Sequence, residues 1–242
     1  MKIVIDIGNT SITAGLFERK KLVKRIHFKL KNDFDAFLDS LDSYDIKTSI
    51  ISSVVPQKTN EYIKVIKDRY NLESFLINYQ CCPLDLDVLE PESIGADRLC
   101  NITAASIDYD CPAIVVDFGT STTFDVINSK KQFIGGVIAP GVETSAQYLV
   151  DKAALLNSVP LKFPENAIGK VTKTNIQSGI MYGAIDQVEG MVQRIILETN
   201  EKYQIILTGG FSILISEKLK INHIVDIDLT LRGMVHLYAS QH

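Results

Sequence analysis

Three features common in membrane and secreted proteins are missing from this sequence. No apolar run approaches the roughly 20 residues of a membrane-spanning helix, and the first one, residues 2–7, is too short for the core of a signal peptide. The four cysteines show no Cys-x-x-Cys spacing, and the adjacent Cys81 and Cys82 have poor geometry for a disulfide. We therefore expect a cytoplasmic protein with reduced thiols, no metal bound to cysteine and no membrane partner.

Strong charge of one sign and flexible linkers are also absent. The formal net charge is -4, with Lys and Arg scattered rather than gathered in a basic stripe, so we expect no nucleic-acid partner. No low-complexity or Pro/Gly-rich segment divides the 242 residues. The length suits two lobes of roughly 110 to 130 residues, and we expect them at 1–110 and 111–242, joined by a turn near Asp108–Pro112.

The most informative feature present is an internal repeat. The segment Asp-Ile-Gly-Asn-Thr-Ser-Ile-Thr at 6–13 returns as Asp-Phe-Gly-Thr-Ser-Thr-Thr at 117–123, one residue shorter. Each copy follows an apolar, β-branched run typical of a buried strand. Glycine allows the backbone to turn tightly, and the Asn, Thr and Ser residues supply groups that donate to phosphate oxygens. The repeat predicts two loops that bind nucleotide phosphates.

The aspartates of the repeat also predict a cation. A carboxylate ~4 Å from a phosphate oxygen is repelled by about 4 kcal/mol per unit charge at an effective dielectric constant of ~20. Asp6 and Asp117 therefore need a cation beside the phosphates, and Mg²⁺ is the natural candidate because it combines one or two carboxylates with substrate phosphates. In a single copy, Asp-x-Gly could equally mark a turn after a strand.

Hydrophobic periodicity predicts similar elements in the two halves. After the first strand, we expect strands at 12–18, 22–28, 49–55 and 74–77, with helices at 33–41, 60–70 and 97–106. In the second half we expect strands at 113–118, 123–128, 132–138 and 204–207, and helices from about 143, at 175–200 and at 232–239.

Further motifs narrow the assignment. Gly95-Ala96-Asp97-Arg98 after Pro91, the segment 135–141, Gly-Lys-Val-Thr at 169–172 and Leu-Thr-Gly-Gly at 207–210 join the two loops in a fixed order. The strand-and-loop repeat resembles the acetate kinase, sugar kinase, Hsp70 and actin superfamily. These motifs in order resemble type III pantothenate kinases over essentially the whole chain.

This resemblance implies a fold and a reaction. The fold is α/β, with two duplicated actin-like (ribonuclease H-like) lobes, each a mixed five-stranded sheet flanked by helices, and the nucleotide cleft between them. The reaction is ATP-dependent phosphorylation of pantothenate to 4′-phosphopantothenate, the first step of coenzyme A biosynthesis. It also implies Mg²⁺, a monovalent cation (K⁺ or NH₄⁺) and a homodimer that holds pantothenate where two subunits meet.

The resemblance assigns roles to individual residues. Asp97 is the catalytic base, Asp6 lies on the magnesium side and Asp117 binds the monovalent cation. The pantothenate contacts are Gly95, Ala96, Asp97, Arg98 and Thr172. The ATP contacts are Asp6, Ile7, Gly8, Asn9, Thr10, Ser11, Ile12, Thr13, Thr120, Gly209 and Gly210.

The residues themselves leave some of these roles open. A helix N-terminus favours an anion by about 0.3 to 1 kcal/mol, so we expect Asp97 to be ionised, and Arg98 offers a planar fork for the pantothenate carboxylate. The pair could instead be a capping Asp beside a surface Arg. Thr172 could instead cap the following helix, a role that Thr174 could also fill.

The sequence departs from the family at one position. The family commonly has a pantothenate-contacting tyrosine seven residues before Gly95, where this chain has Val88. Tyr79 or a different apolar contact could replace it. The acidic residues nearby, Asp85, Asp87 and Glu90, add negative charge close to the expected site of an anionic substrate.

The predicted helix at 175–200 bears on the homodimer. Its apolar residues recur every three or four positions with glycines between them, which makes a broad apolar face. The face could pack on a second subunit, or it could lie under the sheet of its own lobe. Two other functions stay open: a kinase of the same superfamily with another acceptor, and a non-catalytic homologue, which would be expected to lose Asp6 or Asp97.

Overall fold

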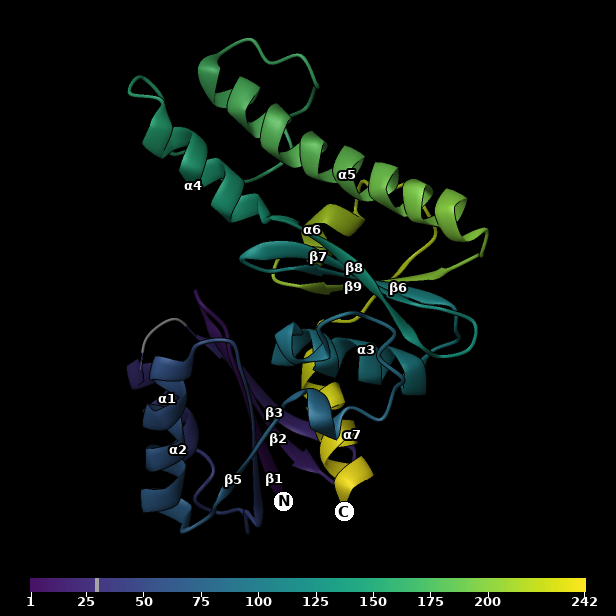
Figure 1. Cartoon of the computed structure of the whole chain (residues 1–242). Helices are drawn as coiled ribbons and strands as arrows, with labels where there is room; N and C mark the ends of the chain where they lie inside the picture. Colours follow the sequence, from purple (N-terminus) through teal and green to yellow (C-terminus); the bar gives the residue numbers. More distant parts are fainter. Residues whose placement is uncertain (29–30) are drawn as a thin grey trace. The chain divides into compact units, whose positions relative to one another are not determined.

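A computed structural model describes residues 1–28 and 31–242 of the chain (Figure 1). The described residues form two compact units. Unit 1 consists of Met1–Asp108 together with Asp228–His242, and unit 2 of Tyr109–Ile227. No helix among the described residues has the length and apolar character that crossing a membrane would require.

Unit 1 is built on a five-stranded sheet in the order β3-β2-β1-β4-β5. Central strand β1 pairs antiparallel with β2 and parallel with β4, so the sheet is mixed. The strands are β1 (Lys2–Ile7), β2 (Ile12–Glu18), β3 (Lys21–Phe28), β4 (Thr48–Ser53) and β5 (Ser74–Leu76).

Two pairs of helices cover the two faces of this sheet (Figure 1). On one face, α1 (Lys31–Asp39) and α2 (Pro56–Tyr70) bury aromatic side chains such as Phe34 and Tyr62 against Ile3, Ile5 and Ile7 of β1. On the other face lie α3 (Ala96–Asp108) and α7 (Leu229–Gln241). Alternation along β1 turns Asp6 toward the α3 and α7 face, because successive side chains of a strand point to opposite sides. The short turns η1 (Tyr79–Cys81) and η2 (Pro91–Ser93) connect β5 to α3.

Unit 2 repeats the same sheet. Its order is β10-β9-β6-β7-β8, with β6 antiparallel to β7 and parallel to β9. The strands are β6 (Ala113–Phe118), β7 (Ser121–Ile127), β8 (Phe133–Pro140), β9 (Gln204–Gly209) and β10 (Ile224–Val225). Matching β1 to β6 and β4 to β9 superimposes the order and direction of all five strands, which confirms the predicted duplication.

The helices of unit 2 are α4 (Val142–Lys152), α5 (Thr172–Thr199) and α6 (Ser212–Ser216). Buried residues of α5 pack into one core with the strands: Met181, Val188, Val192 and Ile195 lie in the same cluster as Val116 and Leu207. The apolar face of α5 is thus covered by its own sheet. These buried residues agree with the alternative interpretation, in which the face lies under its own sheet, whereas a Cβ on Gly179, Gly183 or Gly190 would meet nothing within 4 Å. The packing of α5 on a second subunit stays a prediction.

The C-terminal helix departs from the predicted division of the chain at residues 110 and 111. That division assigned 111–242 to one lobe, whereas Asp228–His242 is part of unit 1. Gly233 of α7 packs against Cys100 of α3, and Arg232 and His236 bond Asp108 at 2.8 and 2.9 Å. Local periodicity cannot reveal such an assignment, because it depends on a partner helix more than 100 residues away.

Candidate active site

The two glycine loops close in the same way. In the first loop, the N–H of Gly8 donates to the carbonyl of Ser11 at 3.0 Å. In the second, the N–H of Gly119 donates to the carbonyl of Ser121, also at 3.0 Å, although the loop is one residue shorter. The structure thus forms the repeated turn that the sequence predicts at both strand ends.

Each loop aspartate lies between two hydroxyl-bearing residues on the neighbouring strands of its sheet. Asp6 is in register with Thr13 on one side and Ser52 on the other. Asp117 is likewise in register with Thr123 and Thr208. The Ser52 hydroxyl donates to Oδ1 of Asp6 at 2.8 Å. The sequence analysis did not single out Ser52. The one feature of the sequence that could have indicated its role is its place near the end of a buried strand.

The other residues of the first loop divide by exposure. Ile7 and Ile12 are buried core residues, so only their backbone groups can face a ligand. Asn9 and Thr10 are exposed, and the ammonium of Lys58 in the first turn of α2 donates to the Asn9 carbonyl at 3.2 Å. Lys58, which the sequence analysis missed, brings a positive charge to a loop predicted to bind phosphates.

Asp97 lies in the first turn of α3, as predicted, and is partly buried. Its Oδ1 accepts the backbone N–H of Arg98 at 2.8 Å, and a Cβ on Gly95 would lie 2.5 Å from the same oxygen. Burial raises the pKa of Asp97, outweighing the lowering by this hydrogen bond and by the Arg98 charge. The shift runs opposite to the one expected from the helix N-terminus, because desolvation of the carboxylate is the larger effect. A raised pKa suits a general base that works near neutral pH.

A buried thiol lies near both carboxylates of unit 1. Burial, followed by the nearby carboxylates of Asp6 and then Asp97, raises the pKa of Cys100 well above its usual range. The structure therefore brings Asp6, at the end of β1, and Asp97, at the start of α3, into one neighbourhood. Nothing in the sequence spacing of these two residues indicates that they meet.

In unit 2, close backbone approaches surround the second loop. Gly209 has φ +86, and a Cβ there would lie 2.4 Å from Oδ1 of Asp117. The carbonyl of Thr120 accepts the N–H of Gly141 at 3.0 Å and the hydroxyl of Thr144 at 2.6 Å. Glycine at 209 is thus needed for both backbone conformation and space, whereas a Cβ on Gly210 would meet nothing within 4 Å.

Thr172 is the first residue of α5, and its neighbour performs the capping. The hydroxyl of Thr174 accepts the N–H groups of Lys170 and Val171 at 3.1 and 3.3 Å. The alternative interpretation of Thr172 as the cap is therefore excluded. Its side chain is exposed at the start of the helix, where it remains a predicted pantothenate contact.

The Asp6 carboxylate is better suited to binding Mg²⁺ together with substrate phosphates than to forming a metal site from protein ligands alone. Among residues 1–28 and 31–242, no group of three or more His, Cys, Asp or Glu side chains is arranged to hold a metal ion. Mg²⁺ commonly keeps several waters and uses one or two carboxylates with substrate phosphates. A single oriented carboxylate such as Asp6, beside a phosphate loop, fits this mode of binding.

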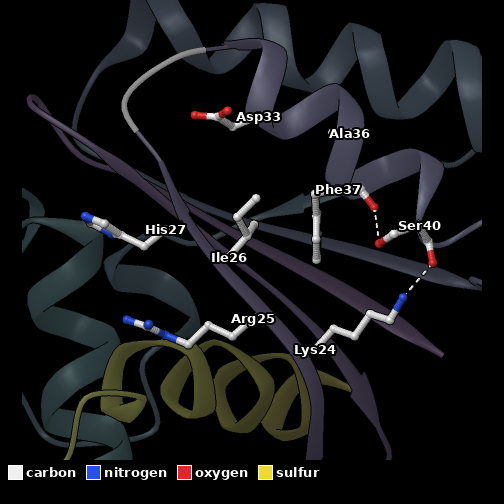
Figure 2. Close-up of a pocket in the computed structure, with 8 residues that line it drawn as sticks. All are labelled: Lys24, Arg25, Ile26, His27, Asp33, Ala36, Phe37 and Ser40. Carbon is white, nitrogen blue, oxygen red and sulfur yellow. Dashed lines mark hydrogen bonds between the residues drawn. The ribbon is translucent and has the colours of Figure 1, made fainter.

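A separate hollow of about 490 Å³ lies on unit 1, away from these residues. Figure 2 shows that it runs along the edge strand β3 beside α1. Two positively charged side chains line this hollow, and both have partners within the protein. Lys24 donates to the carbonyl of Ser40 at 2.7 Å, and Arg25 is paired with Asp228 at 2.9 Å. None of its lining residues belongs to a predicted motif.

Comparison with known proteins decides the family. The model of the type III pantothenate kinase family matches residues 2–194. The chain belongs to the type III pantothenate kinase family. A type III pantothenate kinase of Dehalococcoides mccartyi is 34% identical, over 98% of this chain and 94% of the relative. The chain is accordingly an ATP-dependent kinase that phosphorylates pantothenate, the first step of coenzyme A biosynthesis.

Solved structures confirm the fold. A protein from Campylobacter jejuni described as a putative Baf family transcriptional activator aligns with a TM-score of 0.63 and 21% identity, over 99% of this chain and 98% of that one. The activator of 2-hydroxyisocaproyl-CoA dehydratase from Clostridium difficile, with bound ADPNP, aligns at 0.57 and 11% identity, over 99% and 94% of the two chains. At these identities, the likeness concerns the fold alone: an α/β fold of two units, each a mixed five-stranded sheet flanked by helices.

Proposed function

We propose that Asp97 accepts the proton of the primary hydroxyl of pantothenate as that oxygen attacks the γ-phosphorus of ATP. The proposal rests on the position of this carboxylate: its Oδ1 accepts the Arg98 N–H at the start of α3, the missing side chain of Gly95 leaves room for it, and burial raises its pKa. Because the transition state of phosphoryl transfer is loose, orienting the hydroxyl contributes as much as removing its proton.

The two loops are proposed to hold ATP. In unit 1, residues 6–13 offer backbone N–H groups and hydroxyls to the phosphates, and Lys58 adds a positive charge. In unit 2, Thr120, Gly209 and Gly210 approach the nucleotide with little side-chain bulk. Mg²⁺ bound on the Asp6 side would neutralise the phosphate charge, and a monovalent cation is proposed beside Asp117.

The acceptor contacts are proposed for the segment around Asp97 and for the start of α5. Arg98 carries the charge that complements the pantothenate carboxylate, and its planar guanidinium can bind it through two hydrogen bonds. The Thr172 hydroxyl is available because Thr174 caps the helix. Gly95 and Ala96 place the backbone of the turn close to the substrate.

We also propose a cytoplasmic homodimer. Large apolar side chains are exposed from β8 to the start of α5: Ile138, Tyr148, Leu149, Leu155, Ile168 and Val171. Leu155 and Ile168 are 93% and 76% exposed. These residues lie within one stretch of the chain, 138–171, and exposed apolar surface is typical of a protein interface where it is contiguous. Since Val171 precedes Thr172, a second copy seated here would lie next to the proposed pantothenate contact.

A coupled assay of ATP turnover tests the proposal. Turnover should require pantothenate and should be faster in potassium or ammonium than in sodium, and mass spectrometry should detect phosphopantothenate. Phosphorylation of a hexose with pantothenate left untouched would favour the rival acceptor. Equal rates in all three monovalent cations, with Asp117→Asn behaving like the wild type, would refute the cation role alone.

A further inference from the structure

The hydroxyl of Ser52 is fully buried beside a predicted magnesium-side carboxylate. Ser52 lies near the end of β4 with no exposed surface, in register with Asp6 on the parallel strand β1. Its Oγ donates to Oδ1 of Asp6 at 2.8 Å. A hydrogen bond to one oxygen restricts rotation of the carboxylate about its Cβ–Cγ bond and so fixes the direction of both oxygens.

The internal repeat provides an independent observation. Thr208 of β9 stands in the same register to Asp117 as Ser52 does to Asp6, and it is 1% exposed. Buried hydroxyls are costly unless they are hydrogen-bonded. Both halves of the chain nevertheless have a buried hydroxyl residue beside the loop aspartate, although valine or alanine would fit a buried strand equally well.

The hydroxyl of Ser52 also lies beside α3. The buried Cys100 thiol of α3 lies close to the Ser52 hydroxyl and to the carboxylates of Asp6 and Asp97. Asp6 and the helix that carries Asp97 are thereby connected through two short, buried side chains.

We propose that Ser52 is a positioning residue that fixes the Asp6 carboxylate for the magnesium–ATP complex. The inference rests on the proposed role of Asp6. Ser52 does not touch the reacting atoms; it acts through Asp6, and its hydroxyl lowers the concentration of Mg²⁺ that the enzyme needs. Groups that orient a metal-side carboxylate in this way typically change metal affinity or activity by ~10- to 100-fold when removed.

The test variant is Ser52→Ala, which removes one oxygen and adds no bulk. We expect the Mg²⁺ concentration for half-maximal turnover to rise by ~10-fold or more, while the KM for pantothenate stays within twofold. Calorimetric titration of the protein with ATP in the presence of Mg²⁺ should show the same loss of affinity without any turnover. Ser52→Thr keeps the hydroxyl and should restore most of the affinity, since Thr208 occupies the equivalent position.

Ser49→Ala is the matched control. Ser49 lies on the same strand, is equally buried, and its hydroxyl bonds that of Ser74 at 2.9 Å rather than a loop residue. Both alanine variants should lose similar stability in thermal unfolding, but only Ser52→Ala should change the Mg²⁺ requirement. An equal change in both variants would reduce Ser52 to a purely structural residue.

Asp6→Asn distinguishes the proposed role of Asp6 from that of Ser52. If this variant leaves Mg²⁺ dependence and calorimetric affinity unchanged, the proposed role of Asp6 itself is wrong. If Asp6→Asn weakens both while Ser52→Ala matches the wild type, only the positioning role of Ser52 is overturned. Loss of affinity in Ser52→Thr as large as in Ser52→Ala would also contradict the proposal, provided that the melting temperature of the variant shows a folded protein.

Discussion

Gly233 of α7 lies directly against the main chain of Cys100 in α3: a Cβ at this glycine would stand 1.9 Å from the Cys100 carbonyl oxygen and 2.5 Å from its carbonyl carbon. Two backbones this close leave no room for a side chain. Because α3 carries Asp97 in its first turn, the contact connects the C-terminal helix to the position of the proposed base.

Gly233→Ala should therefore destabilise unit 1. Main-chain atoms cannot yield as a flexible side chain does, so we expect a loss of about 1 to 3 kcal/mol or more in the free energy of unfolding. Gly190→Ala in α5 is the control, since a Cβ there meets nothing within 4 Å and alanine favours helix by roughly 0.5 to 1 kcal/mol. Urea denaturation of both variants measures the difference, and similar midpoints would contradict the close packing.

Asp97→Asn should abolish turnover while leaving ATP affinity nearly unchanged. Loss of a general base costs roughly 100- to 10,000-fold in rate, whereas the amide keeps the shape of the side chain. Steady-state rates and calorimetric ATP binding give the two quantities. Asp68→Asn, on the exposed side of α2, serves as the control. A variant that retained a tenth of wild-type turnover would exclude Asp97 as the base.

The same substitution should stabilise the protein at neutral pH. Burial raises the pKa of Asp97 in the folded state, so the folded protein holds this proton more tightly than the unfolded chain does. The contribution of Asp97 to stability consequently falls as pH rises from the unfolded value of about 3.9 through the raised folded value. Thermal unfolding should give Asp97→Asn the higher melting temperature at pH 7, with the difference shrinking toward pH 4. A lower melting temperature at pH 7 would indicate that the ionised form is well stabilised.

Gly209→Ala should damage the second phosphate loop. The residue has φ +86, and its Cβ would lie 2.4 Å from Asp117 and 2.6 Å from the backbone nitrogen of Phe118. We expect a loss of more than about 1 kcal/mol of stability. Gly210→Ala, one residue later, has open space and should unfold at the wild-type temperature. Equal melting temperatures for both variants would show that the loop can adjust.

The homodimer should persist on dilution if pantothenate contacts depend on it. Light scattering at micromolar concentration should give twice the 26.9 kDa mass of the chain. Tyr148→Glu, within the exposed apolar segment, should lower that mass, whereas Leu197→Glu near the end of α5 should not, although Leu197 is 73% exposed. A fully active wild-type protein with the mass of one chain would refute a shared site.

Much of the fold follows from local patterns in the sequence. The β-branched runs before Gly8 and Gly119 predict β1 and β6, and the structure starts and ends both strands where the pattern does. Helix ends were less predictable: α2 begins at Pro56, four residues before the predicted start, because proline suits the first turn of a helix. The short β10 has only two residues and carries no periodicity of its own.

The sequence predicts which residues form the site, but not how they are arranged in space. Motif order identifies Asp6 and Asp97, but their shared neighbourhood around Cys100 depends on how α3 packs on the sheet. The pKa of Asp97 depends on burial, which no single motif encodes, so the helix-terminus argument gave the opposite direction. The apolar periodicity of α5 could not distinguish a face that meets its own sheet from one that meets another subunit.

The membership of α7 in unit 1 has a consequence for how the enzyme is made. A ribosome delivers the chain from the N-terminus, and domains commonly fold as they emerge. Unit 2 is a continuous segment and can fold once residue 227 has left the exit tunnel, whereas unit 1 must wait for residues 228–242 before α3 acquires its partner. The unit whose synthesis starts first is therefore completed after unit 2, and its proposed catalytic helix stays incompletely packed until α7 has emerged.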